Sequence, residues 1–169
     1  MSGIAAATAA LHDLYLPAGL QLTGPIVAEA ESAEYGACRF ALEGHSIVFR
    51  VAKITPTKTG QFVTLWKRPA PGSDIAPLDA ADAVHFVVIA VSDGTQRGQF
   101  IFSRDLLIER GVMSRDGEGG KRALRVYPPW STPTAKDAIR TRQWQLRCFL
   151  PTGADVSASA GDRLRSLLG

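Results

Sequence analysis

The sequence is poor in the residues that build metal sites and disulfide frameworks. It has two cysteines, Cys38 and Cys148, and three histidines, His12, His45 and His85. Two widely separated cysteines are too few for a disulfide framework, so we expect both to be reduced and buried. The sequence contains no CxxC or HExxH pattern, and no histidine stands close to a cysteine. A zinc site is therefore not expected.

Long apolar runs are missing as well. No stretch approaches the ~20 apolar residues that a membrane-spanning helix needs. The alanine-rich segment MSGIAAATAALHDLYLPAG lacks the basic region and apolar core of a signal peptide, and Gly3 is not the second residue, as a myristoylation signal requires. We therefore expect a cytoplasmic protein that does not associate with membranes.

Common catalytic and cofactor motifs are also absent. There is no GxSxG pattern for a hydrolytic serine. The glycine-rich stretch RDGEGGKRALR fails as a phosphate-binding P-loop, because Lys121 is followed by Arg122 and the loop precedes its strand. We therefore expect no cofactor.

Positive charge is abundant but unevenly distributed. Residues 1–45 contain one basic residue against five acidic ones, whereas residues 46–148 contain sixteen basic residues against nine acidic ones. The net charge of +3 thus combines an acidic first segment with a basic body. Such a body favours polyanionic partners, although it can equally serve solubility.

Apolar periodicity and turn signals predict one mixed α/β (α+β) domain over residues 1–150. The run HFVVIAV is nearly all apolar, as expected of a central strand that is buried on both faces. The small, polar segment 151–169 is expected to be mobile. The predicted strands lie within 38–54, with a turn at Glu43-Gly44, and at 61–68, 85–91, 98–102 and 123–127. The predicted helices are 4–16, 26–37, 104–110 capped by Ser103, and a last helix that is capped by Thr132 or Thr134 and runs through Cys148.

Cations stand beside aromatic residues along the basic body. Grooves for single-stranded nucleic acids combine cations for the phosphates with rings on which bases stack. A tryptophan in a strand or an amphipathic helix is, however, more often part of the core. The candidate phosphate contacts are Arg50, Lys53, Lys58, Lys67, Arg68, Lys121, Arg122 and Arg125. The candidate stacking residues are Trp66, Tyr127 and Trp130.

Four segments in a fixed order resemble the MepB protein family: FRVAKITPTKTGQFVTLWKR, GQFIF, GKRALRVYPPW and QWQ, within residues 27–149. The resemblance implies a fold like that of the PD-(D/E)XK nucleases (restriction-endonuclease-like), in which helices flank a mixed central sheet. It also implies nucleic-acid binding without the nuclease residues. Ser103-Arg104 departs from the Pro-Lys pair usual in the family. The matching residues are Arg50, Lys53, Lys58, Gln61, Trp66, Lys67, Arg68, Gln99, Lys121, Arg125, Tyr127, Trp130 and Trp144.

The sequence itself argues against nuclease chemistry. Such enzymes hold Mg²⁺ with a carboxylate and an Asp/Glu-x-Lys pair, and no lysine here has an acidic residue two positions before it. We expect Glu29, Glu31 or Glu34 to pair with Arg50 or Lys53, although a remodelled metal site could use these glutamates. Because side chains alternate along a strand, Arg50 and Lys53 cannot line one face without a bulge or a twist.

Four functions remain open from the sequence. The favoured one is a non-catalytic protein that binds RNA or single-stranded DNA. The alternatives are a divergent metal-dependent nuclease, a pocket for a small anionic ligand or a peptide at the TPTKTG turn and YPPW loop, and a basic surface that serves only solubility.

Overall fold

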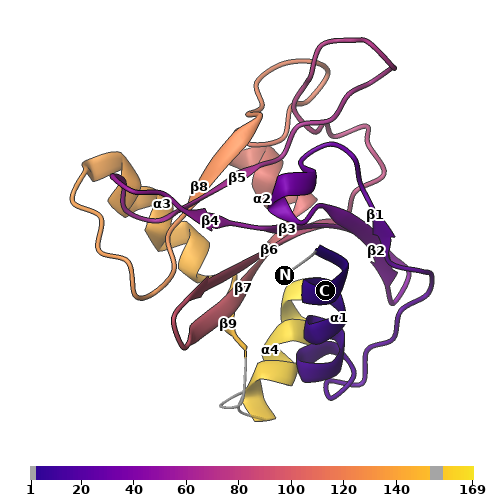
Figure 1. Ribbon diagram of the computed structural model, residues 1–169, viewed down its shortest axis with the longest axis vertical. Helices are drawn as coiled ribbons and strands as arrows, with labels where there is room; N and C mark the ends of the chain where they lie inside the picture. Colours follow the sequence, from indigo (N-terminus) through magenta and orange to yellow (C-terminus); the bar gives the residue numbers. More distant parts are fainter. Residues whose placement is uncertain (1–2, 153–157) are drawn as a thin grey trace.

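The computed structural model describes residues 3–152 and 158–169. A mixed sheet of six strands in the order β1-β2-β3-β6-β7-β9 forms its centre (Figure 1). Strands β3 and β6 pair in parallel, and the other neighbours are antiparallel. The mixed α/β class predicted from the sequence is confirmed. The strands are β1 (Val27–Ala28), β2 (Cys38–Leu42), β3 (His45–Val51), β6 (Phe86–Asp93), β7 (Gln96–Ser103) and β9 (Phe149–Pro151).

Local sequence signals explain the best-defined parts of this sheet. Glu43 and Gly44 both have positive φ, 51° and 78°, and form the tight turn of the β2–β3 hairpin. Strand β6 lies between β3 and β7, and its residues 86–89 are all buried. Both features match the prediction from the sequence.

A second sheet of three antiparallel strands extends from the first. It consists of β4 (Lys53–Ile54), β5 (Gln61–Thr64) and β8 (Ala123–Val126), in the order β4-β5-β8. Figure 1 shows this sheet with α3 (Lys136–Leu146) close to it. The N-terminal cap of α3 is Ala135, without a side-chain hydrogen bond, so the predicted threonine caps are wrong. The helix also ends at Leu146, before the predicted end at Cys148, because the chain turns there into β9.

Ser103 caps α2 (Arg104–Glu109) as predicted. Its hydroxyl accepts a hydrogen bond from the backbone N–H of Leu106 at 3.2 Å, which satisfies one of the free donors in the first turn. The Ser103-Arg104 pair therefore starts the helix without a proline.

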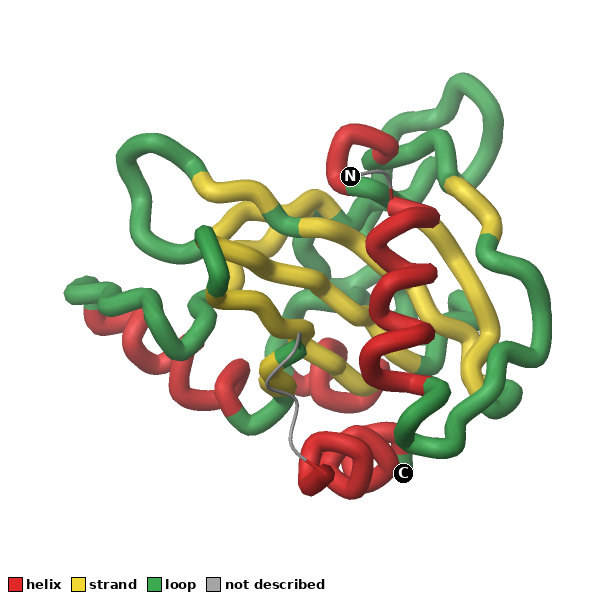
Figure 2. The backbone as a smooth tube through the Cα atoms, turned by 60° about the horizontal axis from the view of Figure 1, so that its bottom comes forward, coloured by secondary structure: helices red, strands yellow, loops and turns green. Residues whose placement is uncertain are grey.

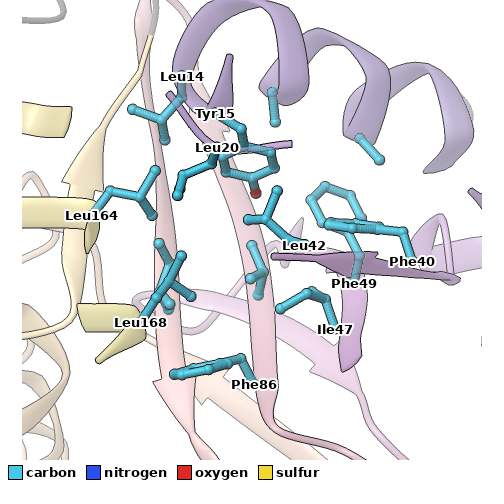
Figure 3. Packing of buried hydrophobic residues seen from close by; sticks show 14 of the residues in the cluster. Leu14, Tyr15, Leu20, Phe40, Leu42, Ile47, Phe49, Phe86, Leu164 and Leu168 are labelled. Atoms are coloured by element: carbon cyan, nitrogen blue, oxygen red, sulfur yellow. The ribbon is translucent and has the colours of Figure 1, made fainter. Parts of the chain in front are cut away.

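Helices cover one face of the central sheet. They are α1 (Gly3–Ala10), the short helical turn η1 (Leu11–Tyr15) and α4 (Ala158–Leu168) (Figure 2). Leu14 and Tyr15 of this layer pack with Phe40 and Phe49 of the sheet (Figure 3). A second apolar cluster, which includes Phe100, lies on the opposite face and joins the two sheets. None of the helices in the described part of the chain is long and apolar enough to cross a membrane.

Part of the last segment, 151–169, is a helix that packs into the core. Residues 153–157 lie outside the described residues, but Ala160, Leu164 and Leu168 of α4 are buried in the same cluster as Leu14 (Figure 3). Their spacing of four residues places them on one side of a helix. The small and polar residues around these three positions make the apolar stripe hard to recognise in the sequence. Because the stripe is buried, α4 is part of the core.

The predicted helix over 26–37 is also wrong. The segment contains β1 and a single 3₁₀ turn, η2 (Ala33–Tyr35), flanked by Ser32 and Gly36 with positive φ of 61° each. This irregular path carries Glu29 and Glu31 toward the cations of neighbouring strands.

Candidate nucleic-acid interface

Arg50 is buried and cannot contact a phosphate. The residue is 1% exposed, and its Nη1 donates to Glu29 Oε1 at 3.1 Å and to the Phe49 carbonyl at 3.0 Å. Burial lowers the pKa of Arg50, and the Glu29 carboxylate opposes that shift. The expected pairing of a glutamate from the first segment with Arg50 is confirmed, and Arg50 leaves the set of candidate phosphate contacts.

Lys67 and Arg68 are already neutralised by acidic partners. Lys67 Nζ donates to both carboxylate oxygens of Asp82, at 2.7 and 2.8 Å. Glu31 accepts hydrogen bonds of 2.8 Å each from Arg68 Nε and from the indole N–H of Trp66. Both bonds lower the pKa of Glu31, and the bond from Arg68 has the larger effect. This part of the predicted surface therefore has little positive charge to offer a phosphate.

The other two predicted stacking residues pack inward. Tyr127 is 9% exposed. Trp130 packs against the second apolar cluster, where its ring meets that of Phe149 edge-on with centroids 5.9 Å apart. Tyr127 is therefore largely buried, and Trp130 is partly held by the core.

Five candidate phosphate contacts remain, and they belong to the second sheet and the loops at its two ends. They are Lys53, Lys58, Lys121, Arg122 and Arg125. Lys121 and Arg122 immediately precede β8, beside the end of β5, where the backbone N–H of Leu65 donates to the Arg122 carbonyl. Lys58 and Arg125 lie at the opposite end of the sheet. Among the residues that the structure describes, none of these side chains has an acidic partner within salt-bridge distance, and the same holds for Lys53.

Lys53, Phe62 and Arg125 form a row across the second sheet, which we call the basic row. Phe62 of β5 is paired in register with Lys53 of β4 on one side and with Arg125 of β8 on the other. Residues directly opposite one another on neighbouring strands share a face. The row therefore has a cation at each end and an aromatic ring in the middle.

Aromatic rings hold the cations of this row in place. The Lys53 ammonium lies 4.6 Å from the centroid of the Tyr35 ring, and the Arg125 guanidinium lies 5.7 Å from that of Phe62. Tyr35 and Phe62 meet edge to face at 6.0 Å. Both rings are partly exposed. Neither Tyr35 nor Phe62 has a basic neighbour in the sequence, so cations beside aromatic residues along the chain do not identify them; only the contacts across strands do.

A cavity of about 200 Å³ adjoins the Arg125 end of the basic row. Lys58 and Thr59 of the TPTKTG turn contribute to its wall, and so does Tyr127 of the YPPW loop. The two segments that suggested an anion pocket thus lie side by side. Arg125 also lines the cavity and donates to the carbonyls of Thr59 and Gly60 at 3.3 and 3.5 Å.

The first turn of α3 completes this cavity. Residues 133–135 and 138 line it, so the positive end of an eleven-residue helix faces the same space as the two cations. No acidic side chain is among its lining residues. An anion in the cavity would meet Lys58, Arg125 and backbone N–H groups of the helix together.

Clustered metal ligands are not found at this surface. Within residues 3–152 and 158–169, no three His, Cys, Asp or Glu side chains lie close enough together to hold a metal ion. The two cysteines are free and buried, and burial raises the pKa of both thiols, that of Cys38 to about 11.

Comparisons with known proteins identify a family model and a solved structure that are similar to this chain. The family model described as MepB-like matches residues 29–151. A crystal structure of MepB superposes with a TM-score of 0.73 and 32% sequence identity, covering 80% of this chain and 89% of the other. No curated protein sequence matches the chain.

Proposed function

The chain belongs to the MepB-like family, and from this membership and its basic row we propose that it binds nucleic acids without cutting them. The preferred partner is single-stranded RNA or DNA, because the exposed features suit unpaired strands. Rings accept bases of any sequence, and cations accept the phosphates. The basic row consists of strand residues and not of a recognition helix, so we expect little sequence preference.

The basic row is the observation that carries this proposal. Lys53 and Arg125 are two strands apart, which corresponds to about 10 Å at the ordinary strand spacing. Phe62 lies between them. A strand laid across β4, β5 and β8 would place a base against the rings of Phe62 and Tyr35 and phosphates against the flanking cations. The cavity beside Lys58 would take a further phosphate.

The proposed absence of cutting rests on the side chains and not on any missing ion. None of the five lysines has an acidic residue two positions before it, and Val51 occupies that position for Lys53. Glu29, which contacts Arg50 of β3, is also paired with Arg39. A metal ion beside Glu29 would meet two guanidinium groups.

A second candidate function is supported by the cavity alone. Lys58, Arg125 and the first turn of α3 could bind a small anion that is not part of a polymer. In that case Lys53 and Phe62 would contribute nothing to affinity. The same binding experiment separates the two functions.

The test is a salt-titrated binding assay with fluorescently labelled single-stranded RNA, single-stranded DNA and duplex DNA. We expect single strands to bind most tightly and their affinity to fall steeply with salt. Lys53→Gln, Lys58→Gln and Arg125→Gln should each weaken binding and reduce the salt slope by about 0.7 for each phosphate that is no longer neutralised. Phe62→Leu should cost about 1–3 kcal/mol of binding energy because a base can no longer stack on the ring.

Lys121→Gln and Arg122→Gln are the matched controls, because these residues carry the same charge at the other end of the sheet. An affinity that is independent of salt would refute the proposal. So would equal losses of affinity in the control and basic-row variants, which would indicate that only net charge matters.

A further inference from the structure

A larger pocket lies on the other side of the molecule's core, between α1 and the central sheet. Its volume is about 440 Å³, within the range of small-molecule sites. It shares no lining residue with the cavity at α3. α1 forms one wall through Ala6, Ala9 and Ala10. Because α1 precedes residues 29–151, this wall lies outside the span that matches the family model.

Small side chains on both walls account for the open space. The three alanines of α1 face a part of the sheet that contributes Val51 and Ala90. Farther along the same strands, larger side chains such as Val88 and Ile101 fill the layer beneath the helices. The walls next to α1 are therefore apolar, and polar side chains surround them.

A buried amide lies at the inner end of this space. Gln99 is 3% exposed, and its Oε1 accepts a 2.8 Å hydrogen bond from the hydroxyl of Tyr15. Burial raises the pKa of Tyr15, so its hydroxyl remains a donor at ordinary pH and fixes the orientation of the amide. The Nε2 group of Gln99 has no hydrogen-bond partner in the described part of the chain, although the residue lines the pocket.

Two opposite charges lie at the mouth of the pocket. Asp13 belongs to η1 and Arg97 to β7, so each wall carries one of them. Both residues are exposed, and neither forms an ion pair with another described residue. Arg97 lies two residues from Gln99 on the same face of β7, nearer to the turn that joins β6 and β7.

We propose that this pocket binds a nucleoside monophosphate, either free or as the terminal nucleotide of a strand. The base lies between the alanines of α1 and the sheet, with its edge against Gln99 Nε2. Asp13 accepts hydrogen bonds from the sugar hydroxyls, and Arg97 binds the phosphate through its planar fork of donors. An amino acid would satisfy Asp13 and Arg97 but would leave the amide of Gln99 unused.

The site goes beyond the proposed function, because it uses none of the residues of the basic row. It also differs from a general polyanion surface. Its polar side chains are Asp13, Arg97, Gln99 and the hydroxyls of Ser92, Thr95 and Thr152, which lie around a slot with apolar walls at Ala6, Ala9 and Ala90. A single cation beside such a slot suits one nucleotide better than a phosphate backbone.

Calorimetric titration of the full chain tests the site with AMP, GMP, CMP, UMP and the corresponding nucleosides. We expect at least one monophosphate to bind. Arg97→Gln should weaken the monophosphate about tenfold or more and leave the nucleoside unchanged. Ala9→Leu, which fills the slot from a helical position, should abolish binding of both. Arg104→Gln is the matched control, because this arginine lies at the opposite end of β7.

Gln99→Glu provides a second test, because it keeps an acceptor for Tyr15 while it removes the free donor. It should weaken the nucleoside, and it should weaken the monophosphate more because the added carboxylate repels the phosphate. A 5′-phosphorylated tetranucleotide that loses affinity in Ala9→Leu would identify a strand end as the source, and binding of the monophosphates alone would identify the free nucleotide.

Failure of all four monophosphates to bind would overturn the proposal, as would binding that survives Ala9→Leu or tighter binding of an amino acid. Loss of polymer binding in Lys58→Gln with intact monophosphate binding would show that the two sites are independent.

Discussion

Removal of the Glu29 carboxylate would leave the guanidinium of Arg50 without its acidic partner. The Arg50 side chain is 2% exposed, that of Glu29 is 25% exposed, and their oxygen and nitrogen atoms are 3.1 Å apart. Breaking a buried pair from one side costs about 3–5 kcal/mol. Because Glu29 is partly open to water, and Arg50 keeps its hydrogen bond to the Phe49 carbonyl, we expect Glu29→Ala to lose about 2–3 kcal/mol of unfolding free energy.

The measurement is urea unfolding followed by circular dichroism at neutral pH. Arg39→Ala is the matched control, because Arg39 bonds the same carboxylate at 3.3 Å but is 39% exposed, so it should cost at most about 1 kcal/mol. The double variant Glu29→Ala/Arg50→Met removes both charges and keeps an apolar stem. It should recover to within about 1 kcal/mol of the wild-type protein.

Two results would refute this reasoning. Equal losses of stability in Glu29→Ala and Arg39→Ala would mean that burial of Arg50 does not decide the cost. A double variant no more stable than Glu29→Ala would mean that the loss comes from the backbone path of residues 26–37 and not from an unpaired charge.

Three further predictions concern the fold. Leu164→Ala should lower the free energy of unfolding by about 2–5 kcal/mol, measured by thermal unfolding, because Leu164 is fully buried. Leu167→Ala is the control, because Leu167 is only half-buried, and an equal or larger loss in this control would contradict the packing of α4 into the core. Gly98→Ala would press its Cβ into the Phe149 ring and should destabilise by about 1–3 kcal/mol, whereas Gly24→Ala, with no atom within 4 Å, should be close to neutral by the same assay. The lowered pKa of Glu31 contributes stability that is present above the ordinary carboxyl value of 4.5 and is lost as the pH falls through the lowered folded value. Acid titration of Glu31→Gln should therefore show a flatter loss of stability than the wild-type protein below that pH, and parallel curves would disprove the link.

The conformation of short segments follows from the sequence wherever local chemistry decides it. Glu43-Gly44 forms a turn because such a pair tolerates positive φ, and HFVVIAV is a central strand because only a doubly covered strand needs apolar residues on both faces. Ser103 caps its helix through its own hydroxyl. Family membership was also evident from four ordered segments, and the charge distribution already separated an acidic first segment from a basic body.

The free cations could not be identified in the same way, because ionic partners come from distant parts of the chain. Arg50 was a reasonable phosphate ligand by charge, and it is the irregular path of residues 26–37 that brings Glu29 against it. The same segment brings Glu31 to Arg68. No periodicity predicts such pairs, since they depend on how a segment without regular structure crosses the sheet.

The basic row depends on tertiary structure in another way. Lys53, Phe62 and Arg125 come from three strands, and only the register among those strands places them on one line. A shift of one residue would turn Phe62 to the opposite face. The sequence thus determined that this protein has a basic, mixed α/β domain of a known family. The three-dimensional pairing of strands decided which of its charges remain free, because pairing sets both the neighbours of a side chain and its exposure to water.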